Sequence, residues 1–508
     1  MDTLDYLLNG FLVALQWQNI FYAFIGVLIG TVVGVLPGLG PISGVALLIP
    51  ITSTLTSGST PEEAAASSII LLAGVYYGAM YGGSTTSILL NTPGESSSVV
   101  TTLDGYQMAK QGRAGAALAI SAIGSFVAGV FSLIALIFLA EPLSELALTF
   151  GPAEYFSLMV LGLCAVTGLA GKSMTKALIM TVLGLLLGTI GIDNVTGVSR
   201  FTFDMPELYQ GLEFLTVAVG LFALGEVWKT ILEFRQEQQT IAKISRITPT
   251  KQELKQSAGP IGRGSLLGFF TGVLPGAGAT IASFFSYVLE KKISKNPEKF
   301  GKGAIEGVAA PESANNAASG GAMIPLLTLG IPGSGTTAVL MGALIMYNIQ
   351  PGPLLFEEHP YVAWGLIASM FIGNLMLLIL NMPLVKLFAK VINAPIKYLT
   401  PIIIAISFFG VYAVQVSTFD LYLLLGLGII GYFLNKNDYP LAPLVLSLIL
   451  GPLMENNFRR ALTASNNDYT VFVTHPISLT FLIGAVLWIV VPLILKARGK
   501  KVIVNDED

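Results

Sequence analysis

Residues 34–40 read GVLPGLG, and residues 272–278 read GVLPGAG. The two heptamers differ at one position and lie in opposite halves of the chain. Proline removes a backbone donor and glycine permits turns that other residues cannot make. Within apolar sequence, each motif therefore predicts a helix–turn–helix hairpin, and the pair predicts two related halves.

Further matches follow in the same order along both halves. Gly82-Gly83 corresponds to Gly320-Gly321, Thr92-Pro93-Gly94 to Ile331-Pro332-Gly333, PAEY at 152–155 to PIKY at 395–398, and Gly220 to Gly451. The offset between partners stays between 231 and 244 residues. A collinear run of this kind favours an internal duplication over a chance coincidence of glycines and prolines in apolar helices.

The composition assigns the chain to the membrane. Of its 508 residues, 53% are hydrophobic and 11% charged, and the mean hydropathy is +0.74. A soluble protein carries about a quarter charged residues, so a soluble enzyme, a nucleic-acid binder and a disordered chain are excluded. Lipid leaves backbone groups no partner outside their own helix. The prediction is an all-α polytopic membrane protein of two inverted-topology repeats with re-entrant hairpins and broken helices.

Three smaller features of the composition bear on the class. The first 20 residues contain no Lys or Arg, so a cleavable signal peptide is not expected. Cys164 is the one cysteine, which excludes an intrachain disulfide. Two histidines are too few for a histidine metal site.

The apolar segments define the predicted organisation. An amphipathic interfacial helix occupies residues 1–18, the first repeat 19–228, a hydrophilic cytoplasmic linker 229–263, the second repeat 264–475, and a final transmembrane helix with a cytoplasmic tail 476–508. Several apolar segments are shorter than the roughly 20 residues that span a bilayer. Short segments interrupted by Gly and Pro indicate re-entrant or broken helices.

Charge placement predicts the orientation of the halves. Lys and Arg concentrate in cytoplasmic loops, and equivalent loops here differ in charge. SGSTPEE at 57–63 lacks basic residues, whereas its counterpart KKISKNPEKFGK at 291–302 is basic. The loop at 110–113 is basic, whereas its counterpart FEEHP at 356–360 is acidic. The halves must then lie upside down relative to each other, as in many secondary transporters.

The proline–glycine tips are the first predicted site element. Backbone amides exposed at membrane depth are tolerated where they line a cavity or are buried in protein, and helix N-termini attract anions. The alternative is a tight loop at the membrane surface. The substrate-binding residues predicted here are Pro37, Gly38 and Gly40, with Pro275, Gly276 and Gly278.

A proline–glycine break followed by hydroxyls is the second element. Such a run starts a new helix with capping side chains, and its hydroxyls and amides can hold a carboxylate. The alternative is that Ser and Thr only satisfy the broken backbone. The residues predicted to bind substrate are Thr92, Gly94, Ser96 and Ser97 in the first half, and Gly333, Ser334, Thr336 and Thr337 in the second.

The segment PESANNAASGG at 311–321 is the third element. Intramembrane ionisable groups are functional candidates by default, and Glu312 could accept a proton or help bind a cation. The alternative is a polar packing seam between helices. The predicted cation-coupling residues are Glu312, Asn315, Asn316 and Asn91, with no metal apart from Na⁺. Asp104 is expected to cap a helix or pair with Lys110.

No enzyme motif is present in the sequence. It contains no nucleotide-binding loop, no zinc-ligand spacing and no nucleophile elbow. Hydrolysis of ATP by this chain therefore cannot drive transport, and no cofactor is expected beyond Na⁺ or H⁺ as coupling ion.

The motifs resemble those of the large membrane subunit of the tripartite tricarboxylate transporter family. The resemblance rests on GVLPGLGPISG at 34–44, YGGSTTSILLNTPGE at 81–95 and GVAAPESANNAASGGAMIPLLTLGIPGSGTTAVLMGALIMYNIQPGP at 307–353. It implies an ion-coupled carboxylate importer, multi-pass in the bacterial inner membrane. It also implies two partners: a small four-helix membrane subunit and a periplasmic substrate-binding protein.

Two other functions remain open on the sequence alone. A stand-alone ion-coupled carboxylate exporter or exchanger could use the same repeat. A channel or structural subunit would not need cation coupling. An elevator-like motion is suggested by analogy with the family.

Overall fold

The protein is almost entirely helical. A computed structural model describes residues 3–36, 39–56, 58–169, 173–193, 195–233, 248–274, 278–391 and 396–497. Within these residues, 7 helices are long and apolar enough to cross a membrane. The one sheet there is a two-stranded antiparallel hairpin in which Gly191 pairs with Arg200. The predicted class, an all-α polytopic membrane protein, is confirmed.

The chain divides into two compact units, and each unit combines segments from both sequence halves. Unit 1 contains Met1–Ser144 and Thr230–Ile406, and unit 2 contains Glu145–Lys229 and Ser407–Asp508. The compact bodies therefore differ from the predicted sequence domains, because corresponding parts of the two halves pack together. Every described residue of the predicted sites belongs to unit 1.

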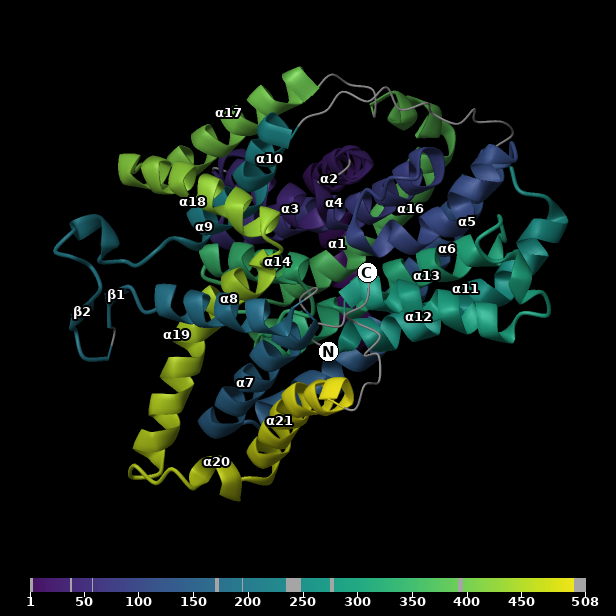
Figure 1. Ribbon diagram of the computed structural model, residues 1–508. Coiled ribbons are helices and arrows are strands. Elements are labelled where there is room, and N and C mark those ends of the chain that lie inside the picture. The colour runs from purple at the N-terminus through teal and green to yellow at the C-terminus, as the bar shows by residue number, and fades with distance from the viewer. Residues whose placement is uncertain are drawn as a thin grey trace. The chain divides into compact units, whose positions relative to one another are not determined.

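Unit 1 contains the longest buried helix, α4, and the Asn-rich helix α13 (Figure 1). The label η marks short 3₁₀- and π-helical segments. Its elements are α1 (Thr3–Ala14), α2 (Trp17–Val35), α3 (Gly40–Leu55), α4 (Pro61–Leu90), η1 (Ser96–Ser98), α5 (Val99–Lys110), most of α6 (Ala114–Leu148), α11 (Lys251–Val273), α12 (Gly278–Ile293), η4 (Pro297–Lys299), α13 (Glu306–Gly321), η5 (Pro325–Leu329), α14 (Gly335–Met346), α15 (Leu355–Glu358), α16 (Pro360–Val391) and the first half of α17 (Ile396–Gln415).

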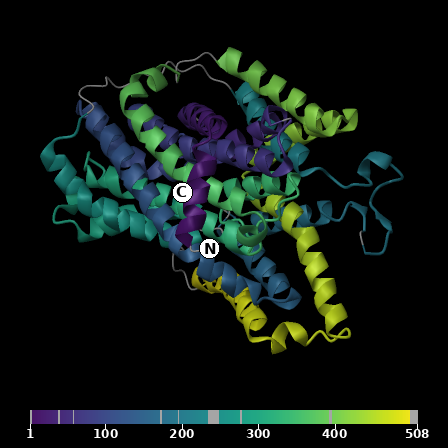
Figure 2. The same cartoon turned by 180° about the vertical axis from the view of Figure 1, so that it is seen from behind.

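Unit 2 contains the hairpin and the C-terminal helices, which are also visible from behind in Figure 2. Its elements are α7 (Pro152–Leu169), α8 (Met174–Leu187), β1 (Gly191–Ile192), β2 (Ser199–Arg200), η2 (Pro206–Leu208), α9 (Phe214–Ala218), η3 (Val219–Leu224), most of α10 (Gly225–Glu233), α18 (Thr418–Lys436), α19 (Leu441–Ala464), α20 (Val471–Thr474) and α21 (Pro476–Ala497).

An ion-pair network fixes the hairpin to α19. Arg459 contacts Asp193 at 3.0 Å and Glu455 at 2.6 Å, and Arg200 contacts Glu455 at 2.9 Å. Thr196 and the amide of Val195 also donate to the Asp193 carboxylate. These donors, first Thr196 and then Val195, with Arg459 adding to them, lower the pKa of Asp193 to about 2.

Glycines at four-residue spacing bring α2 against α4. A Cβ atom added at Gly26, Gly30 or Gly34 would collide with the backbone carbonyl oxygen of Leu71, Val75 or Ala79, respectively. Small residues at this spacing let helix backbones approach closely in membranes. The glycines of α2 are thus required by the packing, and α4 is buried over nearly its whole length.

The second half repeats this arrangement between α11 and α13. A Cβ atom at Gly264, Gly268 or Gly272 would meet the carbonyl oxygen of Ala310, Ala314 or Ala318. The duplication seen in the sequence is therefore also a duplication of contacts. Figure 1 shows α11, α12 and α13 side by side.

These contacts also refine the alignment of the halves. Gly82 approaches the carbonyl oxygen of Thr31, and Gly321 approaches that of Phe269. Gly321 is therefore the structural counterpart of Gly82, one residue from the pairing with Gly320 suggested by the sequence. Helix α11 begins at Lys251, within the predicted linker, where Thr250 and Glu253 form a capping box.

The breaks after α4 and η5 have matching backbone geometry. Asn91 and Gly330 both adopt the left-handed conformation, with φ of 60° and 68°. A short extended segment then leads to an N-cap residue, Glu95 before η1 and Ser334 before α14. The predicted broken helices are present at both sites.

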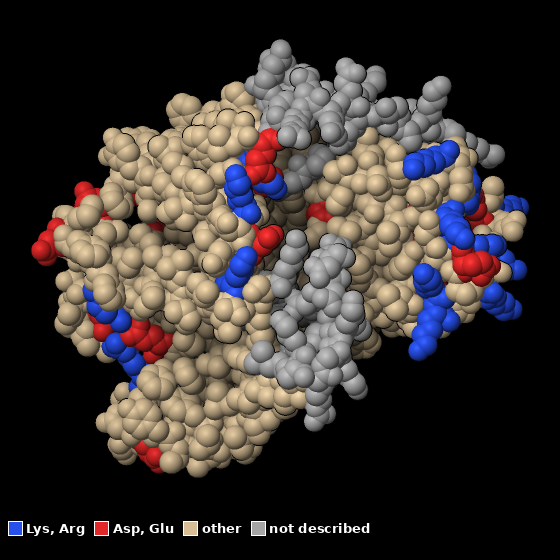
Figure 3. Space-filling view, in the orientation of Figure 1, with Lys and Arg blue, Asp and Glu red and all other residues tan. Residues whose placement is uncertain are grey.

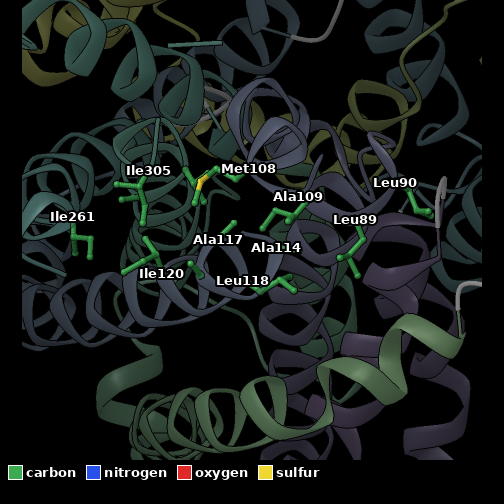
Figure 4. Packing of buried hydrophobic residues seen from close by; sticks show 14 residues of the cluster. Leu89, Leu90, Met108, Ala109, Ala114, Ala117, Leu118, Ile120, Ile261 and Ile305 are labelled. Carbon is green, nitrogen blue, oxygen red and sulfur yellow. The ribbon is translucent and has the colours of Figure 1, made fainter. Parts of the chain in front are cut away.

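An apolar cluster holds α4, α5, α6 and α11 together in unit 1. Figure 4 shows side chains of Leu89, Met108, Ile120 and Ile261 gathered in this cluster. The space-filling view in Figure 3 shows mostly uncharged surface, with basic side chains near the ends of α5, α11 and α12. The cluster also includes Val308 and Ala309 of α13, so it fixes the helices that supply the polar site described next.

Candidate functional site

Glu312 on α13 is fully buried and is surrounded by hydroxyl groups. Ser84 on α4 and Ser121 on α6 donate to its Oε2, the latter at 3.2 Å, and Thr101 on α5 donates to Oε1. Among the described residues, no Lys, Arg or His forms an ion pair with it. Four helices therefore converge on one carboxylate whose hydrogen bonds come from neutral donors.

One helical turn further along both helices, a second polar contact joins α13 to α6. Asn316 donates through Nδ2 to Ser125 at 2.7 Å and to the carbonyl oxygen of Glu312 at 3.0 Å. Residues four apart lie on the same face of a helix. The pairs Glu312–Ser121 and Asn316–Ser125 are therefore two successive contacts between one face of α13 and one face of α6.

Glu95 is the second carboxylate of the site. Asn315 donates through Nδ2 to its Oε1 at 3.0 Å, and Ser97 donates to the same oxygen. Asn315 is fully buried, whereas Glu95 is only partly buried. The break of the first half thus reaches the Asn-rich helix of the second half.

The tips are described only in part. Pro37, Gly38, Pro275 and Gly276 lie outside the described residues. Gly40 and Gly278 have positive φ, 39° and 62°, and a Cβ atom at either would meet nothing within 4 Å. The backbone conformation, rather than crowding, therefore favours glycine at these two positions.

The first break lies close to both Gly-Pro regions. A Cβ atom at Gly94 would collide with the carbonyl oxygen of Gly34 and lie 2.6 Å from Gly83 Cα. The hydroxyl of Ser96 lies 3.0 Å from that of Thr280, two residues beyond Gly278. The structure therefore brings together segments that the sequence separated by about 180 residues.

The hydroxyls of the second break serve the backbone. Ser334 and Thr337 form a capping box at the start of α14. Thr336 is buried and Thr92 partly buried, while Asn91 is exposed at the end of α4. No hydrogen bond among the described residues brings Asn91 to Glu312, and its left-handed backbone accounts for an asparagine there.

The expectation for Asp104 was wrong. Asp104 is fully buried and accepts hydrogen bonds from the amides of Gly301, Gly303 and Ala304 at 2.8–2.9 Å, and from Tyr287 Oη at 2.9 Å. It anchors the loop before α13 and does not pair with Lys110, which instead lies over the ring of Tyr106. Backbone amides from a distant loop, rather than the nearby Lys110, satisfy the Asp104 carboxylate.

A small cavity adjoins the Glu312 hydroxyls. It is lined by Tyr81, Ser84, Thr85, Leu118, Ser121 and Asn381, among others. Ser84 and Ser121 therefore face both this cavity and the buried carboxylate.

Glu95, Ser84, Thr101, Ser121 and Ser125 were not predicted as site residues. The available signal was weak: Ser121 and Ser125 are polar residues four apart in an otherwise apolar helix. Their target depends on which helix faces them, and this is a property of the tertiary structure.

The arrangement combines breaks in two helices, turn glycines with positive φ, and one buried and one partly buried carboxylate with neutral partners. Residues 20–446 match the tripartite tricarboxylate transporter TctA family. The chain belongs to this family. It is therefore a multi-pass membrane protein of a tricarboxylate transporter family, which is not a family of enzymes.

The curated relatives carry no assigned activity. One is an uncharacterised 52.8 kDa protein in the TAR-I ttuC' 3' region of Agrobacterium vitis, 47% identical over 509 residues and 100% of both chains. Another, in the TAR-II ttuC' 3' region of the same organism, is 47% identical over 245 residues, which are 48% of this chain and all of the relative. No solved structure gives a significant match.

Proposed function

We propose that this chain is the transport subunit of a binding-protein-dependent, ion-coupled importer of tricarboxylates or related carboxylates in the bacterial inner membrane. Its partners are a small four-helix membrane subunit and a periplasmic binding protein that delivers the substrate. Membership of the tricarboxylate transporter family supports the general class. The specific claims rest on the buried site of unit 1.

The observation that carries the proposal is the environment of Glu312. A carboxylate inside a membrane protein is costly unless it has partners or a function. Ser84, Thr101 and Ser121 supply hydrogen bonds but no positive charge. A coupling cation or proton provides the missing charge, and a symporter needs such a site beside its anion.

The repeat suggests how the substrate is held. The tips at Gly40 and Gly278 and the breaks at Gly94 and Gly333 supply backbone amides and hydroxyls, which suit a carboxylate. Inverted repeats permit the same site to open to either side of the membrane. Unit 1 carries all the described site residues and is the candidate moving bundle.

The test is reconstitution with and without the partners. Uptake of labelled citrate into proteoliposomes is measured with both membrane subunits, adding or omitting the binding protein. The proposal expects uptake only when the binding protein is present on the outside. Equal uptake without it would favour the stand-alone exchanger.

A further inference from the structure

Glu95 has a placement that its position in the sequence does not explain. It occupies the N-cap of η1, and its side chain folds back over α4. A Cβ atom at Gly83 would lie 2.7 Å from Glu95 Cγ and 3.4 Å from Ser98 Oγ. Glycine at position 83 therefore leaves the space that the Glu95 side chain occupies.

The amide of Asn315 is only half satisfied. Its Nδ2 donates to Glu95, while its buried Oδ1 has no hydrogen-bond partner among the described residues. Leaving a buried acceptor without a partner costs roughly 1–3 kcal/mol of folding free energy, and such groups are rare. The neighbouring Asn316 also has a buried Oδ1 without a partner.

Exchanging the two atoms of the Asn315 amide does not remove the problem. Oδ1 would then lie 3.0 Å from Glu95 Oε1, and two acceptors would face each other. Only a shared proton or cation could relieve that contact. The first orientation leaves Oδ1 without a donor or a cation, and the exchanged orientation places it where a proton or cation shared with Glu95 is required.

The equivalent position in the second half is neutral. Ser334 is the counterpart of Glu95 at the N-cap, and Tyr76 on α4, the counterpart of Asn315 on α13, lies beside Ser334. One of two equivalent pairs thus carries a carboxylate and a carbonyl oxygen, while the other carries two hydroxyls. Of the two equivalent pairs, only the first therefore carries a negative charge.

We propose that the Glu95 carboxylate and Asn315 Oδ1 bind a monovalent metal cation. Carboxylate and amide oxygens suit hard cations, and the single negative charge of the Glu95 carboxylate balances one positive charge. The inference rests on the proposed function, in which transport is coupled to a cation gradient. It adds the Glu95 side chain, at the first break, to the site as a cation ligand.

The test measures cation binding without transport. Binding of ²²Na⁺ to the purified full-length chain is measured in choline buffer without any carboxylate. Glu95→Gln keeps the size of the side chain and removes its charge; Glu298→Gln, an exposed carboxylate in η4, is the matched control. Losing a charged ligand should raise the half-saturating Na⁺ concentration about tenfold to a hundredfold.

The outcomes separate the inference from the proposed function. Na⁺ affinity of Glu95→Gln within twofold of the unmodified protein, or no ²²Na⁺ binding to the unmodified protein, overturns the inference even if citrate uptake is intact. Glu95-dependent Na⁺ binding supports it even if uptake fails. Should Glu95→Gln not fold, as judged by its melting temperature without Na⁺, Glu95→Asp keeps the charge on a shorter side chain and should still weaken binding severalfold; unchanged affinity there also overturns it.

Discussion

The hydroxyl of Ser121 donates to Oε2 of Glu312 at 3.2 Å, across the interface between α6 and α13. This contact joins a helix of the first half to the Asn-rich helix of the second. Because Ser125 and Asn316 repeat it one turn further on, the carboxylate is held in a rigid frame.

Neutralising Glu312 should uncouple transport without unfolding the protein. Glutamine retains an acceptor oxygen, and the surrounding hydroxyls can accept from its NH₂ group. Glu312→Gln should reduce gradient-driven citrate uptake at least tenfold. The variant should still exchange labelled for unlabelled citrate. Glu298→Gln should behave normally in both assays. Normal accumulation in Glu312→Gln would remove Glu312 from the coupling mechanism.

The glycine contacts predict a sharp difference between neighbouring positions on α11. Gly268→Ala places a Cβ atom against the carbonyl oxygen of Ala314, whereas Gly262→Ala meets nothing within 4 Å. Overpacking costs about 1–3 kcal/mol, so Gly268→Ala should lower the melting temperature in detergent. Gly262→Ala should leave it unchanged or raise it, since alanine favours helix. Equal melting temperatures would contradict the α11–α13 packing.

Some of the fold could be predicted because it depends on local sequence. Turns and helix breaks require particular residues at particular positions. The local sequence therefore predicts the turns at Gly40 and Gly278 and the breaks at Pro93 and Pro332. The partner of Asp104 could not be predicted, because loop amides some 200 residues away fill its hydrogen bonds. The same holds for Glu95, whose neighbour Asn315 comes from the other half. The start of α11 at Lys251 was missed because polar residues there resembled a linker, although the Thr250–Glu253 capping signal was present.

The proposed inverted topology predicts which loops face the cytoplasm. Residues 229–263, 291–302 and the C-terminal tail carry much of the basic charge and should be inside, whereas 57–63 should be outside. In a Cys164→Ser background, Lys295→Cys should resist an impermeant thiol reagent in intact cells and react after permeabilisation. Ser59→Cys should react in intact cells. Labelling at position 295 from outside would exclude the inverted repeat.

The hairpin of unit 2 should lose an electrostatic contribution at low pH. The pKa of Asp193 is lowered to about 2, first by Thr196 and the amide of Val195. A carboxyl with a lowered folded-state pKa stabilises the fold above its unfolded pKa near 3.9, and this contribution disappears as pH falls toward about 2. Asp193→Asn should therefore increase proteolysis of the loop between β1 and β2 at neutral pH. The difference from the unmodified protein should shrink between about pH 4 and 2, and a constant difference across that range would contradict this role.

Concentrative uptake in a defined system tests the central claim most directly. Proteoliposomes containing both membrane subunits receive labelled citrate and the binding protein, with an inward Na⁺ gradient, an inward proton gradient, or neither. The account predicts accumulation above the external concentration under at least one gradient, and its loss when the gradient is dissipated. Citrate that only equilibrates across the membrane under every gradient would contradict an ion-coupled importer.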